Sequence, residues 1–237
     1  LADEIVSISI PQRKGDPLVI ANDEGVRAET TMESLGGLKP AFDKDGTITA
    51  ANASQLSDGG SAVVMMSERF VKDRGIKALG QVVSYGMVAG PDNASLLTQP
   101  SRAILKALNK VGMTVSDINL FELNEAFATV GIASMAELGI SDDIVNVNGG
   151  AIALGHPIGM SGNRVALTIL HELRRRGGGV GAAGALDHWQ RRSRWRRGHG
   201  ATSRPLRHAL RARSPSPSLR DRKVFLFLVI PDLIRDP

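Results

Sequence analysis

The central part of the chain alternates short apolar runs with longer stretches in which apolar residues recur at helical spacing. Runs rich in β-forming residues predict strands, and apolar positions three or four residues apart predict helices. The expected strands cover 81–88, 118–123 and 144–148, and the expected helices cover 101–111, 124–138 and 161–176. Because strands and helices alternate, the pattern indicates βα units in a layered α/β domain.

The pattern is less regular toward the N-terminus. Residues 1–57 mix short apolar runs with Gly-Asp-Pro, Gly-Gly and Asp-Gly turns, so we expect a loop-rich region with one or two strands and a short helix at 32–35. From Asp58 to Asp73 apolar residues recur at helical spacing and predict a further helix, with Gly75 as its C-cap.

The alternation stops after about Gly184. Between Asp187 and Arg213 the chain has clustered arginines and no sustained apolar period, and a Ser-Pro repeat follows. Such sequence does not easily offset the entropy cost of ordering, so we predict that residues 186–237 are disordered. The abrupt apolar run 224–230 is expected to be prone to aggregation.

The positive charge of the chain is concentrated in this tail. The net charge is +5 and the pI is about 9.9, yet residues 174–222 hold fourteen arginines against two acids, and residues 1–173 are net acidic. Arginines around Trp189 and Trp195 resemble a nucleic-acid patch, but no matching fold surrounds them. We therefore expect no specific nucleic-acid partner, only salt-sensitive adhesion to polyanions.

The chain contains no cysteine, which excludes disulfides, thiolate metal sites and a cysteine nucleophile of its own. The absence of cysteine fits a cytoplasmic location. Its histidines lack a companion ligand pattern, so no metal is expected, and no run reaches the about 20 apolar residues of a membrane helix. The N-terminus has neither Met nor a signal pattern, and we interpret it as the interior of a longer polypeptide.

One loop carries the most distinctive chemistry. It reads Asn-Val-Asn-Gly-Gly-Ala-Ile-Ala-Leu-Gly-His-Pro-Ile-Gly-Met-Ser-Gly over 146–162, with His156 among glycines and followed by proline. Glycine permits sharp turns and close approach of the backbone to a ligand, and Pro157 has its own φ angle fixed by its ring. We therefore expect the imidazole of His156 to be held in place for a chemical role. Asn124 opens Asn-Glu-Ala-Phe after the preceding strand, and such strand ends collect ligand-contacting groups. We expect Asn124 and His156 to meet.

Each of these residues also has a purely structural interpretation. His156 alone could be a loop histidine satisfied by backbone hydrogen bonds, and Asn124 could be a helix N-cap. Ser54 could be a turn or cap serine. Glu125 is expected to be a first-turn or structural acid rather than an acid catalyst.

Three segments together resemble the signatures of the thiolases, the acetyl-CoA C-acyltransferases. They are Asp-Gly-Thr-Ile-Thr-Ala-Ala-Asn-Ala-Ser-Gln-Leu-Ser-Asp-Gly over 45–59, Asn-Glu-Ala-Phe over 124–127, and the glycine loop around His156. The resemblance runs from about residue 1 to 176. It implies an α/β fold of two similar, packed βαβαβαββ halves, with a loop domain inserted in the first half.

The resemblance also implies an organisation for the chain. Residues 1–57 correspond to a remnant of the loop domain, 58–78 to the end of the N-terminal half, and 79–185 to the C-terminal domain. Residues 186–237 form a non-homologous tail. The first half, with the cysteine that accepts the acyl group, is expected to precede Leu1.

Individual roles follow from the same resemblance. In the family a thiolate attacks an acyl-CoA thioester, and the acyl-enzyme then reacts with the enolate of a second acyl-CoA. His156 matches the histidine that activates the cysteine, and it helps to hold the thioester oxygen together with a water fixed by Asn124. Further residues match positions along the CoA path or in the pocket walls: Arg27, Ser34, Phe42, Ala50, Ser54, Phe127 and Ile158.

The C-terminal part departs from the family pattern. Thiolases carry a second cysteine, in Cys-x-Gly-Gly-Gly, which moves the α-proton of the substrate. Leu186 stands at the aligned position, and Asp-His-Trp-Gln follows it. We interpret this departure as a shift of the reading frame near residues 180–186.

The resemblance predicts a thiolase-type acyltransferase that makes or breaks carbon–carbon bonds of 3-oxoacyl-CoA. Coenzyme A and acyl-CoA are expected as substrates, with no permanently bound cofactor, and the full-length family forms homo-oligomers. Without either cysteine, this chain alone is expected to be inactive. The alternative is a noncatalytic CoA-binding or assembly fragment, and a third hypothesis is a nucleic-acid adaptor acting through the tail.

Overall fold

A mixed β-sheet forms the centre of the molecule in the computed structural model, which describes residues 2–88, 94–186 and 224–230. Its strands, in spatial order, are β3 (Gln81–Ser84), β6 (Val224–Ile230), β5 (Gly181–Leu186) and β4 (Leu120–Leu123). β4 and β5 pair in parallel, whereas β6 runs antiparallel to both of its neighbours. The molecule therefore has the layered α/β architecture that the sequence predicts.

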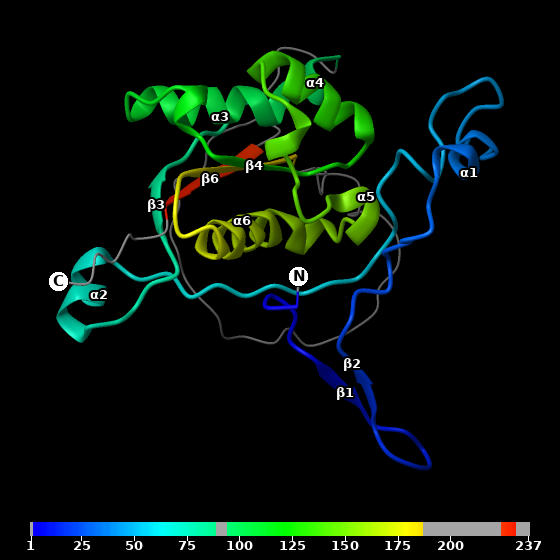
Figure 1. The fold of residues 1–237 in the computed structure, drawn as a ribbon, viewed down its shortest axis with the longest axis horizontal. Coiled ribbons are helices and arrows are strands. Elements are labelled where there is room, and N and C mark those ends of the chain that lie inside the picture. The colour runs from blue at the N-terminus through cyan, green and yellow to red at the C-terminus, as the bar shows by residue number, and fades with distance from the viewer. Residues whose placement is uncertain (1, 89–93, 187–223, 231–237) are drawn as a thin grey trace, which may run out of the picture.

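Helices cover both faces of this sheet (Figure 1). α3 (Gln99–Lys110) and α4 (Ala128–Leu138) lie on one face, and α6 (Ile158–Arg175) lies on the other. The extended segment 54–67 runs along the side of α6 that faces away from the sheet, where Asn163 Nδ2 donates to Ser61 Oγ at 2.6 Å. α6 is thus enclosed between the sheet and this segment.

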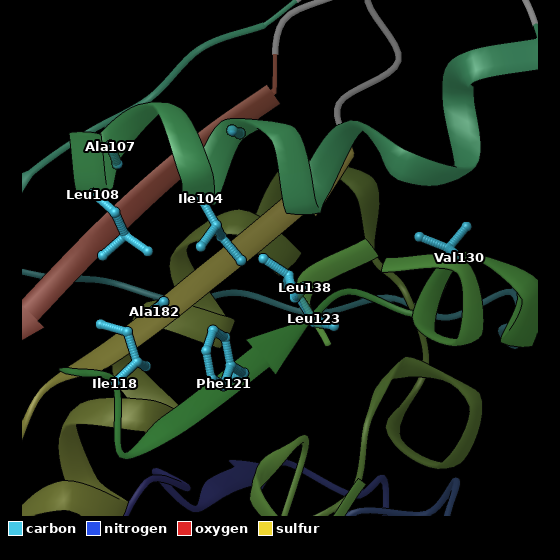
Figure 2. Close-up of a cluster of buried hydrophobic side chains, with 10 residues drawn as sticks. Ile104, Ala107, Leu108, Ile118, Phe121, Leu123, Val130, Leu138 and Ala182 are labelled. Atoms are coloured by element: carbon cyan, nitrogen blue, oxygen red, sulfur yellow. The ribbon is translucent and has the colours of Figure 1, made fainter. Parts of the chain in front are cut away.

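The alternation of side chains along β4 divides the core into two clusters. Phe121 and Leu123 pack on one face with Ile104 and Leu108 of α3 (Figure 2). Leu120 points to the other face, where it packs against α6. Because both faces of β4 are buried, its sequence is almost continuously apolar, as expected of a covered parallel strand. The α6 side of the second cluster consists of Val165, Ile169 and Leu173.

Several predicted elements are confirmed. α3 has Pro100 at the start of its first turn, as the sequence indicates. Gly75, which was expected to end the helix before it, is the C-cap of the helix Glu68–Arg74 and has a left-handed conformation with φ of 58°. The N-terminal region holds a hairpin of β1 (Ile8–Ile10) and β2 (Leu18–Ile20), and then α1 (Met32–Gly36). Short helical turns complete the structure at Ala94–Thr98, Val115–Asp117, Asp142–Ile144 and Ala151–Leu154 (α5).

Other boundaries differ from the prediction. The helix expected over 58–73 is confined to α2 (Glu68–Arg74), because Ser67 caps its N-terminus by accepting a hydrogen bond from Phe70 N, and the residues before it are extended. The strand expected at 144–148 is reduced to a single parallel bridge between Phe121 and Val145. There the chain turns back toward the site instead of continuing along the sheet.

The disorder predicted for residues 186–237 is wrong for β6, whose backbone pairs with β3 on one side and β5 on the other. The apolar, β-forming run 224–230 forms backbone hydrogen bonds with the edges of β3 and β5. The free energy gained from this pairing offsets the entropy cost of ordering the run. Leu186 likewise belongs to β5. The predictions for 187–223 and 231–237, including the arginine cluster, lie outside the described residues. Within the described ranges, no helix is long and apolar enough to cross a bilayer.

A carboxylic acid is buried between the sheet and α6. The Glu122 side chain is 3% exposed, and its Oε2 lies 4.0 Å from Arg164 Nη1, too far for a hydrogen bond. Burial raises the pKa of Glu122 to about 8, and the opposing attraction of Arg164 is the smaller effect. Glu122 is therefore largely protonated at neutral pH.

Replacing Glu122 by glutamine should stabilise the protein at alkaline pH. The pKa of Glu122 is higher in the folded chain than the ordinary 4.5, so the wild type loses stability as the pH rises from about 4.5 through about 8. Glu122→Gln cannot ionise, and we expect it to gain roughly 4 kcal/mol over the wild type between pH 5 and pH 8.5 in urea unfolding. An exposed control, Glu33→Gln, should show no such gain. Parallel pH profiles for Glu122→Gln and wild type would contradict the burial argument.

Candidate active site

Asn124 and His156 lie together at the end of β4. The backbone N–H of Asn124 donates to Gly184 O of β5 at 2.9 Å, which continues the parallel ladder by one residue and holds Asn124 completely buried. Its Nδ2 lies 3.2 Å from His156 Nε2 and 3.4 Å from His156 Nδ1. The expectation that the two side chains meet is confirmed.

The backbone on either side of His156 fixes the direction of the ring. Gly155 has φ of 86°, and a β-carbon there would collide with Ser57. Pro157 is the N-cap residue of α6, which begins at Ile158. The imidazole is thus held between a left-handed glycine turn and a helix N-terminus, and its Nδ1 lies 2.7 Å from Ser161 Oγ in the first turns of that helix.

Glu125 fastens the turn after β4 to the histidine loop. Its Oε1 accepts from Asn146 Nδ2 at 2.6 Å and its Oε2 accepts from Ile152 N at 3.1 Å. The carboxylate occupies the space that a β-carbon at Gly150 would fill, so a side chain there would displace the carboxylate. Glu125 therefore acts as a structural acid, as the sequence indicates, although α4 starts only at Ala128.

Asn146 also holds the histidine loop to the end of β4. Its carboxamide accepts from Leu123 N at 2.8 Å and donates to Leu123 O at 2.9 Å, in the manner of a neighbouring strand. Asn146 has φ of 47°, a left-handed conformation that asparagine tolerates better than most residues. The hydrogen bonds replace the strand that the sequence predicts at this position.

A second carboxylate secures the same loop to α6. Glu172 Oε2 accepts from Asn148 Nδ2 at 2.9 Å, and Glu172 Oε1 accepts from Arg176 Nε at 2.7 Å. Hydrogen bonds from Asn148 and Arg176 lower the pKa of Glu172 to about 2, so the carboxylate stays ionised over the neutral range. No group of histidine, aspartate and glutamate side chains suited to hold a metal occurs among the described residues.

Gln55 joins the N-terminal region to the site. Its Nε2 shares its hydrogens among the carbonyl oxygens of Gly25 (3.0 Å), Ile152 (3.2 Å) and Ala153 (3.0 Å). The backbone carbonyl oxygen of Gln55 accepts a hydrogen bond from His156 N at 3.4 Å. The loop-rich region thereby contributes directly to the position of His156.

The residues expected along the CoA path fall into two groups. Ser54 lies against the turn, because its N–H donates to Ala126 O at 3.1 Å and the adjacent Ala53 bridges to Phe127. Ile158 is exposed and begins α6, two residues after His156. Ser54 and Phe127 thus lie at the turn that follows Asn124, and Ile158 lies close to His156 in sequence, whereas their roles along the CoA path stay predictions.

The other predicted CoA residues lie on the exposed loop region, which includes α1, apart from the sheet and its helices (Figure 1). Ser34 has a local role, since it forms the capping box of α1 with Thr31. Phe42 is 77% exposed, and Arg27 and Ala50 are also exposed. The structure does not bring these residues to the Asn124–His156 pair, and their role in CoA binding stays a prediction.

Gln55, Asn146 and Ser161 position the site although they were not among the predicted site residues. All three lie inside the recognised segments, but a polar residue in a loop gives no signal of the partner it meets. The N-cap interpretation of Asn124 is wrong, because the N-cap of α4 is Phe127.

Removing the Glu125 carboxylate should destabilise the protein. Glu125→Ala leaves Asn146 Nδ2 and Ile152 N without their acceptor, and charge-assisted hydrogen bonds of this kind contribute about 1.5–3 kcal/mol each. We expect a loss of about 2–4 kcal/mol in denaturant unfolding. The exposed Glu29→Ala is the control, with a change below about 0.5 kcal/mol. A loss below about 0.5 kcal/mol for Glu125→Ala would mean that this carboxylate does not hold the histidine loop to the turn after β4.

Comparisons with known proteins identify the family. Residues 1–69 match the family described as "Thiolase, N-terminal domain", and residues 76–187 match "Thiolase, C-terminal domain". A "Probable acetyl-CoA acetyltransferase" of Mycolicibacterium smegmatis is 57% identical over 182 residues, which cover 77% of this chain and 47% of that protein. The chain spans about half the length of the curated relatives it matches.

Solved structures give the same result. The crystal structure of the Bacillus anthracis acetyl-CoA acetyltransferase superposes with a TM-score of 0.77 at 36% identity, over 96% of this chain and 50% of that one. Human mitochondrial 3-ketoacyl-CoA thiolase in complex with CoA superposes with a TM-score of 0.72 at 35% identity, over 90% of this chain and 46% of that one. By sequence and by fold, this chain belongs to the thiolase family.

Proposed function

We propose that this chain carries the histidine-and-asparagine part of a thiolase site, whose reaction is acyl transfer to or from coenzyme A. The observation that carries the proposal is the contact between buried Asn124 and His156, with Nδ2 to Nε2 at 3.2 Å. An imidazole titrates near neutral pH and can take a proton from a nucleophile or donate a hydrogen bond to an oxyanion. A carboxamide beside it can orient the ring and hold a polar ligand.

The surroundings of Asn124 support this chemistry. Its Oδ1 is buried and accepts no hydrogen bond from the described residues, which is costly for a group that has only a structural role. An acceptor kept in this way can hold a water or a substrate group near the imidazole. The proposed contribution is to hold a water that donates a hydrogen bond to the thioester oxygen as negative charge develops on it. The loss of one such donor typically costs an enzyme about 2.7–4 kcal/mol of barrier lowering.

The chain supplies this part of the site without a nucleophile. Acyl transfer in the proposed reaction requires a thiolate, and the 237 residues include no cysteine. Serine and lysine offer no equivalent leaving group for the second half-reaction. We therefore infer that the chain by itself binds CoA without turning over acyl-CoA.

Coenzyme A should stabilise the purified chain against heat, because a ligand that binds only the folded state raises the apparent stability. We expect an increase in melting temperature with millimolar CoA, and a weaker increase for Arg27→Ala, since Arg27 matches a position on the CoA path. Arg13→Ala removes another exposed arginine of the same region and serves as the matched control. Complete insensitivity to CoA would contradict CoA binding.

Turnover is tested separately with acetoacetyl-CoA. The purified chain should cleave none of it above the rate without protein, because no thiolate is present to accept the acetyl group. Measurable cleavage that is lost in His156→Ala would show that the chain uses a different nucleophile, and the inference of inactivity would then be wrong.

A second candidate function, an assembly fragment that combines with a complementary polypeptide, is favoured by one observation. The extended segment that leads to α2 exposes four consecutive large apolar residues, and such a contiguous patch typically marks an interaction surface. They are Val63 (44% exposed), Val64 (80%), Met65 (70%) and Met66 (45%). Mixing the chain with the N-terminal half of the Mycolicibacterium smegmatis relative discriminates the two functions, since an assembly fragment should form a stable complex on size-exclusion chromatography.

A further inference from the structure

The extended segment 55–61 lies against the histidine loop and the start of α6 through every second residue. This period is expected of an extended chain, whose successive side chains point to opposite sides. Leu56, between the first two contacting residues, is fully exposed. The contacts follow the same order along both segments: Gln55 with Ile152 and Ala153, Ser57 with Gly155, Gly59 with Pro157 and Met160, and Ser61 with Asn163. The histidine loop thus rests on one continuous face of segment 55–61.

Gln55 also reaches a third segment of the chain. Its Nε2 lies 3.0 Å from Gly25 O and 3.0 Å from Ala153 O, with Ile152 O at 3.2 Å. A side-chain amide nitrogen carries two hydrogens, so these three acceptors share them. Gly25 lies 30 positions before Gln55, and Ala153 lies 98 positions after it. One side-chain amide therefore ties the turn at Gly25 to the histidine loop.

The backbone around this junction leaves little room for either segment to move alone. A β-carbon at Gly25 would come within 2.8 Å of Ala153 O, so the two segments approach closely. On its other side, the Gly25 turn is held by Asp23, whose Oδ1 accepts from Gly25 N at 2.8 Å. The backbone oxygen of Gln55 accepts from His156 N at 3.4 Å. A displacement at Gln55 thus reaches His156 both through its side chain and through its backbone.

We propose that Gln55 is a positioning residue whose side-chain amide couples the position of His156 to the turn at Gly25. The proposal deepens the function proposed above and rests on it for the chemical role of His156. Arg27, which is predicted to lie on the CoA path, follows Gly25 by two residues. A ligand that orders this turn would therefore also order the loop that carries the imidazole, through an amide that touches neither the ligand nor the reacting atoms.

Replacing Gln55 by methionine tests the coupling, because methionine has a similar length and no hydrogen-bond donor. Three carbonyl oxygens then lose Nε2, and the segments at both ends of the junction should open more often. In Gln55→Met we expect the backbone N–H groups of Gly25 and His156 to exchange with deuterium about tenfold faster than in the wild type. The ¹H–¹³C signal of the His156 ring should shift as well. A purely local role for Gln55 would change exchange only near residue 55.

Gln12→Met is the matched control. The Gln12 amide nitrogen also donates to a backbone carbonyl, Ile10 O at 3.2 Å, but in the hairpin of β1 and β2. Its loss should leave the exchange of Gly25 and His156 and the His156 ring signal as in the wild type. Wild-type exchange at His156 in Gln55→Met, or an effect of Gln12→Met as large as that of Gln55→Met, would overturn the proposal.

The coupling is also tested from the opposite end. Asp23→Ala loosens the Gly25 turn, and Asp23→Asn serves as its reference because it removes the charge and keeps an acceptor. Relative to Asp23→Asn, we expect Asp23→Ala to shift the His156 ring signal in the wild-type background and to have little effect in the Gln55→Met background. Equal shifts in both backgrounds would mean that Gln55 does not transmit the change.

The wild-type chain gives a result even if a variant does not fold. Nuclear Overhauser contacts should join the Nε2 hydrogens of Gln55 to backbone hydrogens of both Gly25 and Ala153, and their absence would overturn the proposal. None of these measurements uses CoA. A chain that fails to bind CoA would contradict the proposed function and leave the coupling standing, whereas a chain without the coupling could still bind CoA.

Discussion

The parallel pairing of β4 with β5 is the constraint on which the site depends. This pairing continues past the end of β4 through the bond from Asn124 N to Gly184 O, and it fixes the backbone from which the Asn124 side chain extends. The histidine loop has no strand of its own at this edge. It is held by side chains instead, with Asn146 bonded to Leu123 and Glu125 bonded to Asn146 and Ile152. A strand end and a loop thereby become one rigid unit.

The carboxyl groups next to this unit differ in pKa. Glu125 and Glu172 accept hydrogen bonds from the loop, and the pKa of Glu172 falls as a result. Glu122 precedes Leu123 in β4 and lies 4.0 Å from Arg164, whose attraction does not offset desolvation, so burial raises the pKa of Glu122. Similar carboxyl groups thus differ in charge at neutral pH, because hydrogen bonds favour the ionised form of Glu172 whereas desolvation disfavours that of Glu122.

The sequence predicted the features that repeat locally and missed those that depend on distant partners. α3 and β4 follow from spacing and from Pro100. The pairing of Asn124 with His156 was expected because both were predicted to follow strands, and it forms although the strand before the histidine loop does not. The strand expected at 144–148 did not form, because Asn146 bonds to Leu123 through its side chain. Ser161 and Gln55 carried no signal, since only the folded arrangement shows that they contact the histidine loop. The prediction of disorder failed at β6 because composition does not reveal that two strands, β3 and β5, have edges between which this segment can pair.

The place of β6 in the sheet also affects the order in which the chain can fold. Among the described strands, β3 joins the sheet only through β6, and the two are separated by most of the α/β domain in sequence. Contacts between such distant segments form slowly, because a long loop must close before they contribute. During synthesis, β4, α6 and β5 can assemble before β6 has emerged, whereas β3 cannot pair with β6 until residues 224–230 have left the ribosome. Chaperones would have their longest opportunity to bind there.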